Sequence, residues 1–167
     1  VPLSMSGDAD SGTSSFTMTG GSLTSLSGHV FHVTNTSSVI SLSGVSIVNR
    51  DAENILVSVC ADGWSGAENK AAIKASAQVL EGTILVGSDS ALTLELTEGS
   101  TFTGCIGGNI SNSKGKVVST ETGNVSVSLD SSSSWTLTAD SSISSLSGNT
   151  SGVNTNGYKL YVNGQIF

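Results

Sequence analysis

A short alternating pattern recurs along this chain and constrains its fold more than any other feature. Each copy contains an alternating apolar and polar stretch, a small polar corner and a second apolar stretch. The clearest copies begin at Phe16, Ile40, Leu92 and Trp135. Alternation with a period of two is typical of β-strands, and the Gly, Asn, Asp and Ser residues at the breaks suit tight turns. The pattern therefore predicts an all-β chain of short strands.

The spacing of the copies predicts how the strands are stacked. Further copies are weaker, and together the starts fall near residues 16, 40, 71, 92, 115 and 135. An interval in the low twenties is typical of a solenoid, because three short strands and three turns need about that many residues. Successive coils would stack at about 4.8 Å through backbone hydrogen bonds. We therefore expect a β-solenoid of about six coils, with the four clear copies at corresponding positions.

The solenoid is expected to occupy residues 1–167 as a single domain, with a lead-in at 1–13 and a closing strand at 158–167. The longest interval has surplus residues at 49–54 and 61–70, which we interpret as loops at the coil edge. Ala67–Leu80 leaves two alternatives open, because its composition has good helix propensity while a strand keeps the period.

Several stretches also resemble a known superfamily. They are Phe16-Thr-Met-Thr-Gly-Gly-Ser-Leu-Thr-Ser, Val30-Phe-His-Val-Thr-Asn-Thr with Val39-Ile-Ser-Leu, Gln78-Val-Leu-Glu-Gly-Thr-Ile-Leu-Val, Ser134-Trp-Thr-Leu-Thr-Ala-Asp-Ser-Ser-Ile, and Asn156-Gly-Tyr-Lys-Leu-Tyr-Val-Asn-Gly. Over most of residues 14–164 the chain resembles the pectate-lyase-like right-handed parallel β-helix superfamily, and more narrowly clostridial cell-surface carbohydrate-binding β-helix proteins. The resemblance implies a right-handed parallel β-helix, a surface location, polysaccharide ligands and calcium in some members. No site motif of the family matches residue by residue.

The charge of the chain excludes some partners. The net charge is −7, with one arginine and five scattered lysines, so no positive stripe exists to neutralise phosphates. Nucleic acid and anionic lipid surfaces are therefore not expected as partners. No apolar stretch approaches 18 residues, and membrane insertion is not expected. About three residues in ten are Ser or Thr, which is far above ordinary usage. This composition suggests an extracellular or cell-surface protein.

Two cysteines, Cys60 and Cys105, leave a disulfide and two buried thiols as alternatives. The coil count separates them by two layers, which is about 10 Å at the β spacing. A disulfide needs Cα atoms within about 7 Å. We therefore expect thiols.

The residue clusters that could carry catalysis are sparse. Arg50 with Asp51 and Glu53 is the single grouping that resembles lyase chemistry, and a solvated turn is the favoured interpretation. His29 and His32 are the two histidines, but no third metal ligand or nucleophile elbow accompanies them. We therefore predict no catalytic residue and no enzyme activity.

The loop from Asp62 to Asn69 is the candidate ligand-binding site. It contains Trp64, Asp62, Glu68 and Asn69. An exposed indole can stack on a sugar, while carboxylates and amides can take hydroxyls or calcium. The alternative is that Trp64 folds back onto an apolar edge. Trp135 is instead expected in the core, because it begins an alternating strand.

The leading functional hypothesis is a non-catalytic extracellular or cell-surface module that binds carbohydrate or supports adhesion, with a polysaccharide or cell-surface glycan as partner. The metal ligands remain unassigned, no cofactor is assigned, and calcium is left open. One alternative is a structural stalk or filament subunit that self-associates through the solenoid ends. A polysaccharide lyase or hydrolase is the third alternative.

Overall fold

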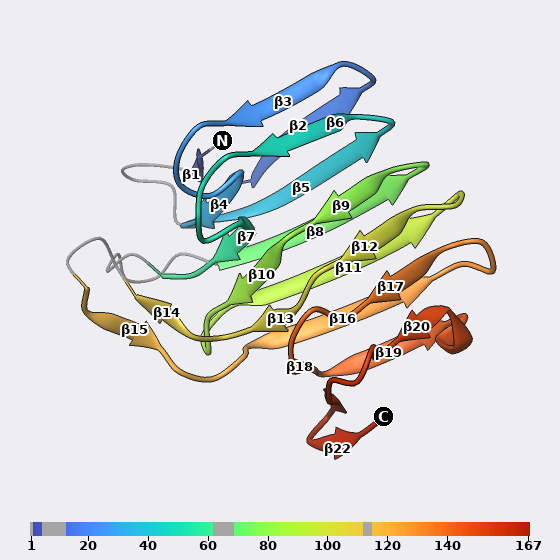
Figure 1. The fold of residues 1–167 in the computed structure, drawn as a ribbon. Coiled ribbons are helices and arrows are strands. Elements are labelled where there is room, and N and C mark those ends of the chain that lie inside the picture. Colours follow the sequence, from blue (N-terminus) through green and yellow to red (C-terminus); the bar gives the residue numbers. More distant parts are fainter. Residues whose placement is uncertain (1, 5–12, 62–68, 112–114) are drawn as a thin grey trace.

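The computed structural model describes residues 2–4, 13–61, 69–111 and 115–167, and these form an all-β arrangement of stacked, mainly parallel strands (Figure 1). The six-stranded sheet contains β2 (Thr13–Thr19), β5 (Thr36–Ser43), β8 (Asn69–Ser76), β11 (Ala91–Thr97), β16 (Asn124–Leu129) and β19 (Ser145–Gly148). The five-stranded sheet contains β1 (Pro2–Ser4), β4 (Phe31–Thr34), β7 (Ile55–Val59), β10 (Thr83–Val86) and β13 (Ile106–Gly107).

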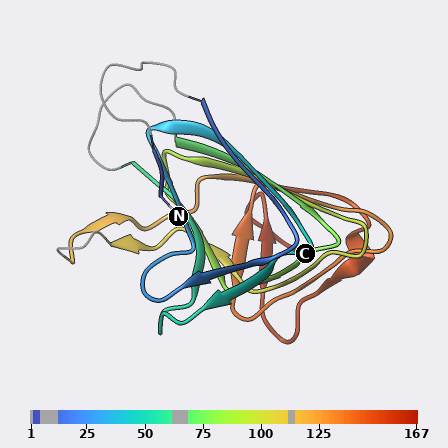
Figure 2. The ribbon, with the colours of Figure 1, turned by 90° about the horizontal axis from the view of Figure 1, so that it is seen from above.

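A third side completes the molecule. It contains the pair β3 (Ser22–Ser25) and β6 (Ser46–Asn49), and a four-stranded sheet of β9 (Val79–Glu81), β12 (Thr101–Thr103), β17 (Ser134–Thr136) and β20 (Val153–Asn154). The chain passes from the six-stranded sheet to the third side and then to the five-stranded sheet, as in β5, β6 and β7 and again in β8, β9 and β10. Seen from above, the strands enclose a single interior (Figure 2). This arrangement is compatible with the predicted parallel β-helix.

The register of the six-stranded sheet aligns one column of inward side chains. The column consists of Phe16, Ile40, Ile73, Leu94, Val127 and Leu146. The expected match of Phe16 with Ile40 is confirmed. The expected positions of Leu92 and Trp135 are wrong: Leu92 pairs with Ala71, and Trp135 lies on the third side opposite Phe102. The same alternating pattern occurs on different sides, so it does not by itself identify the side.

The core prediction for Trp135 is confirmed. The indole is fully buried, and its Nε1 donates a hydrogen bond to the Gly104 carbonyl at 3.0 Å. Its ring stacks on Phe102 with the ring centroids 5.7 Å apart and an interplanar angle of 18°. Satisfying the indole N–H is what allows so large an amphipathic side chain to lie in the interior.

The segment with two alternatives is a strand over its described part. β8 alternates between buried Ala71, Ile73 and Ala75 and exposed Lys70 and Lys74. The helix alternative is therefore wrong for residues 69–76. Parallel pairing with β5 and β11 satisfies the backbone on both edges, and this outweighs the good helix propensity of alanine and lysine.

An antiparallel hairpin is an insertion that the period did not predict. It pairs β14 (Ile110–Ser111) with β15 (Val117–Ser119) and delays the next strand of the six-stranded sheet to Asn124. The start expected near residue 115 is therefore wrong. At the C-terminal end, β18 (Ser141–Ile143) pairs with β21 (Leu160–Val162), and β22 (Gln165–Ile166) adds antiparallel to β21. The short 3-10 helix η1 (Thr150–Gly152) precedes β20.

The two cysteines lie two layers apart, next to alternate strands of one sheet, as the coil count predicted. Cys60 follows β7 and Cys105 precedes β13, with β10 between those two strands. Both residues lie in the described part of the chain and are present as thiols. One intervening strand separates them by about 10 Å along the stack, and they also lie at opposite ends of their strands, so they are well beyond the reach of a disulfide.

Candidate functional site

A groove of about 460 Å³ interrupts the third side between β6 and β9. Within the described ranges β6 pairs with β3 and β9 pairs with β12, but β6 and β9 do not pair with each other. Figure 1 shows the separation of these two strands. The lining residues are Gly44, Val45, Ser46, Ile47, Asn49, Asn54, Ala77, Val79 and Glu81.

The side chain of Gln78 closes one end of the groove. Its Oε1 accepts the Val45 N–H at 2.8 Å, and its Nε2 donates to the Val45 carbonyl at 2.7 Å. The same Nε2 also donates to the Val79 carbonyl at 2.9 Å. Gln78 is 1% exposed, so its amide takes the place of a strand neighbour for a buried stretch of backbone. The two backbones are thereby held one side chain apart.

The turn between β6 and β7 closes the other end. The carbonyl of Asn54 accepts the Thr83 N–H at 2.9 Å, which joins the turn to the start of β10. Within the turn, Asn49 Oδ1 accepts the Asp51 N–H at 3.0 Å, and Asn49 Nδ2 donates to the Ile55 carbonyl at 3.1 Å. The extra residues that the repeat interval predicted at 49–54 therefore form a turn, which borders the groove, and that prediction is confirmed.

Backbone edges form both walls of the groove. The N–H groups of Ser46 and Arg50 donate to the carbonyls of Gly21, which precedes β3, and of Ser25 at its end, so alternation turns the N–H and C=O of Ile47 toward the groove. On β9, the Gly82 N–H donates to the Thr103 carbonyl, so the N–H and C=O of Glu81 turn toward the groove. The groove thus presents donors and acceptors in alternation along two parallel strands.

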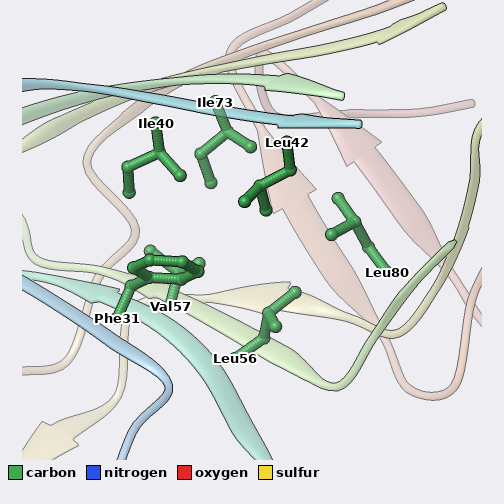
Figure 3. A pocket seen from close by; sticks show the side chains of 7 residues that line it. All are labelled: Phe31, Ile40, Leu42, Leu56, Val57, Ile73 and Leu80. Atoms are coloured by element: carbon green, nitrogen blue, oxygen red, sulfur yellow. The ribbon is translucent and has the colours of Figure 1, made fainter. Parts of the chain in front are cut away.

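Apolar core residues lie behind the groove. Figure 3 shows Leu56 and Leu80 among the side chains that point toward one another there. Both leucines are 1% exposed, and the space that the cluster surrounds has no room for a water molecule. The groove therefore has a dry and closely packed floor, which keeps its two walls in fixed positions.

The sequence-predicted ligand loop lies mostly outside the described residues. Asp62, Trp64 and Glu68 fall in the range 62–68, and their assignment stays a prediction. Asn69 begins β8 and is 8% exposed, and its Oδ1 accepts the Asn35 N–H at 2.9 Å. In the structure Asn69 thus supports the backbone at the start of two neighbouring strands.

The two histidines share one buried serine. Nδ1 of His29 and Nδ1 of His32 lie 2.6 Å and 2.8 Å from Ser58 Oγ, and the ring centroids are 6.0 Å apart. The single hydroxyl proton of Ser58 can be donated to one ring only. Burial lowers the pKa of His29, against the opposing charges of Glu53 and Asp51. Ser58 is 0% exposed, which keeps its hydroxyl away from any substrate.

The Arg50, Asp51 and Glu53 grouping forms a turn. Asp51 Oδ2 accepts the Gly28 N–H at 2.6 Å, and Asp51 Oδ1 accepts the Glu53 N–H at 3.0 Å. These two backbone donors lower the pKa of Asp51. Over the described residues, no group of three or more His, Cys, Asp or Glu side chains is arranged to hold a metal ion.

Comparison of the chain with protein-family models, curated proteins and solved structures gave no match. In the part of the chain that the structure describes, no helix is long and apolar enough to cross a membrane. Sequence reasoning predicted the turn at 49–54 but missed the groove itself. The sequence feature that marks the groove is Gln78, a buried glutamine at an otherwise apolar strand start. Its role is recognised only in the structure, where Val45 lies beside it.

Proposed function

We propose that this chain is a non-catalytic surface module that binds carbohydrate in the groove between β6 and β9. The observation that carries the proposal is the missing strand pairing, which leaves two backbone edges facing an open space of about 460 Å³. Ligand pockets commonly enclose roughly 300–1,000 Å³. A groove of this volume suits a short stretch of sugar chain.

The chemistry of the walls suits sugar hydroxyls. A hydroxyl both donates and accepts, so it can satisfy an N–H and a C=O of the same strand edge. Ser46 and Asn54 add side-chain polar groups, and Glu81 adds a carboxylate. Val79, which is 58% exposed, offers an apolar surface for the C–H face of a sugar ring. The groove combines these groups on strands whose positions the core fixes.

The finer description of the fold belongs to the same proposal. The parallel pairs and the repeated order of sides support a parallel β-helix of about six coils. Crossovers between parallel strands are right-handed in about 98% of cases, which favours the right-handed form. Membership of the pectate-lyase-like superfamily and an extracellular or cell-surface location rest on the sequence resemblance. Calcium as a second ligand is part of the hypothesis to be tested.

The test is a glycan array probed with the labelled chain, with and without calcium. We expect binding to a restricted set of glycans. A dependence on calcium would assign the ion a role, whereas equal binding in a chelator would remove calcium from the proposal. Absence of binding to every neutral, acidic and amino-sugar glycan on the array would contradict the proposed function.

Two matched variants locate the site. Val79→Trp fills the groove, and Val117→Trp makes the same change at an equally exposed valine in the β14–β15 hairpin. The two valines are 58% and 57% exposed. We expect Val79→Trp to abolish binding and Val117→Trp to preserve it. Equal binding by both variants would place the glycan elsewhere on the chain.

The loop predicted from the sequence supplies a third variant. If Trp64 stacks on the sugar, Trp64→Ala should weaken binding by about tenfold, which corresponds to ~1.4 kcal/mol, and leave the melting temperature unchanged. A large fall in melting temperature with unchanged affinity would instead identify Trp64 as a cap on an apolar edge.

A further inference from the structure

The charge along the β6–β9 groove has one sign. Glu81 is the one ionisable residue among those that line the groove. Glu81 and Val79 are exposed on β9, whereas Leu80 between them is buried in the core, so the Glu81 carboxylate lies on the outer side of the wall. The partner of Glu81 in β12 is Thr103, which adds no charge. A ligand in the groove therefore meets one carboxylate and no cationic side chain among the lining residues.

The turn that borders the groove keeps the same sign. Arg50 follows Asn49, but Asp51 and Glu53 follow it within the turn. Residues 44–54 and 77–81 together contain one arginine against one aspartate and two glutamates, which gives a net charge of −2. The whole chain carries −7. The groove is thus a negative site on a negative protein, so it attracts a cationic ligand and repels an anionic one.

The Glu81 carboxylate is available to a ligand, unlike the carboxylate of Asp51. Asp51 accepts the N–H groups of Gly28 and Glu53 and thereby stabilises its turn. Over the described residues, no group donates a hydrogen bond to the Glu81 side chain or forms an ion pair with it. In this part of the chain the Glu81 oxygens are therefore free to accept hydrogen bonds from a bound molecule.

The walls of the groove match the hydrogen-bonding capacity of an ammonium group. An ammonium group has three donors and no acceptor. The Glu81 carboxylate is an acceptor, and so are the backbone carbonyls of Ile47 and Glu81 that face the groove. Hydrogen bonds between charged partners are roughly twice as strong as those between neutral groups. An acetylated amine has lost the charge and keeps one N–H, while a uronic acid brings a second carboxylate beside Glu81.

We propose that the groove selects glycans whose sugars carry free, protonated amines, and that it discriminates against uronic-acid and sulfated glycans. The inference rests on the glycan binding proposed above and names its substrate class. Neutral sugars can lie between the amino sugars in such a chain, because their hydroxyls can use the remaining N–H and C=O groups of the two strand edges.

The test compares three oligosaccharides of equal length by titration calorimetry at about pH 5.5, where a primary amine carries its proton. They consist of glucosamine, of N-acetylglucosamine with the same linkage, and of galacturonic acid. The first two differ only in the acetyl groups, so their comparison isolates the charge of the amine. We expect the glucosamine oligomer to bind at least about fivefold more tightly than the acetylated one. The galacturonic acid oligomer should bind most weakly, and added salt should reduce these differences because it screens exposed charges.

Two matched variants assign the preference to the groove. Glu81→Gln keeps the size of the side chain and removes its charge, and Glu95→Gln makes the same change at an exposed glutamate of β11 in the six-stranded sheet. We expect Glu81→Gln to bind the glucosamine and N-acetylglucosamine oligomers with similar affinity, and Glu95→Gln to keep the original preference. Both positions are exposed, so both variants should keep the original melting temperature.

The outcomes separate this inference from the proposed function. Equal affinity of the original chain for the free and acetylated amines, or tightest binding of galacturonic acid, overturns the inference and leaves glycan binding in the groove standing. Equal loss of preference in both variants overturns the assignment to Glu81, because attraction to the net charge would then explain it. Failure to bind any glycan, here and on the array, overturns the proposed function itself. The comparison of free and acetylated oligomers uses the original chain, so it decides the inference even if Glu81→Gln is unstable.

Discussion

The side-chain amide of Gln78 binds both backbone groups of Val45, accepting its N–H at 2.8 Å and donating to its carbonyl at 2.7 Å. A glutamine here performs the task that a neighbouring strand performs elsewhere in the molecule. The groove exists because the Gln78 side chain, in place of a neighbouring strand, bonds the Val45 backbone and so holds β6 and β9 apart.

Replacing Gln78 with leucine should destabilise the chain by about 2 kcal/mol or more, because the Val45 N–H and carbonyl would remain buried without partners. The measurement is the free energy of unfolding in urea. Gln165→Leu is the control, since Gln165 is exposed in β22. Equal stability of the two variants would contradict the role assigned to Gln78.

Gly104→Ala should cost at least about 2 kcal/mol of stability, because overpacking a close backbone contact forces the backbone to move. A Cβ at Gly104 would lie 1.9 Å from the Gly82 carbonyl oxygen. Gly107→Ala is the matched control, because a Cβ there would meet nothing within 4 Å. Thermal unfolding of both variants makes the comparison, and similar melting temperatures would show that the contact between the two glycines is looser than described.

Asp130 should contribute an acid-dependent part of the stability. The Glu98 N–H donates to its Oδ2 at 2.7 Å, and with the hydroxyl of Ser132 this lowers the pKa of Asp130 from 3.8 to about 2. A depressed carboxyl pKa stabilises the fold above the unfolded value of 3.8, and this contribution disappears as the pH falls toward 2. The midpoint of unfolding should fall less steeply for Asp130→Asn than for the original chain when it is measured at pH values from 3.8 down to about 2.

His29 should make the stability of the fold depend on pH at higher pH values than Asp130 does. Burial lowers its pKa below the ordinary 6.5, so the folded state binds fewer protons than the unfolded state. The stabilising contribution is present above 6.5 and is lost as the pH falls through the lower folded value. Urea midpoints at pH values on both sides of 6.5 measure it. His29→Gln should flatten this dependence, and an unchanged slope would exclude His29 as its source.

The period of the sequence predicted the all-β class and the parallel stacking, because alternation and turn residues are local signals. It paired Phe16 with Ile40 correctly, and it placed Cys60 and Cys105 two layers apart. It failed where the position of a residue depends on the side of the coil that its strand occupies, or on an inserted hairpin. Trp135 carries the same alternating pattern as Ile40 but lies on another side, and the β14–β15 hairpin displaced the later starts.

The candidate site was harder to predict than the fold. Loop residues such as Trp64 attract attention because their side chains suit a ligand, whereas the groove depends on an absence of pairing between Ser46–Asn49 and Val79–Glu81. A missing hydrogen-bond ladder leaves no mark in either strand's own sequence. Gln78 is the one residue whose type reports it, and its partner Val45 lies 33 positions earlier.

The break between β6 and β9 also determines how this part of the stack can bend. Among the described strands, β5–β8 and β7–β10 pair across it, and β5–β8 is a continuous ladder of eight residue pairs. On the third side the same two layers are held by the hydrogen bonds of Gln78 and Asn54 and by no ladder. Regions with few backbone hydrogen bonds open at the lowest cost in free energy. A bending force should therefore widen the groove on the third side, with β5 and β8 as the hinge line.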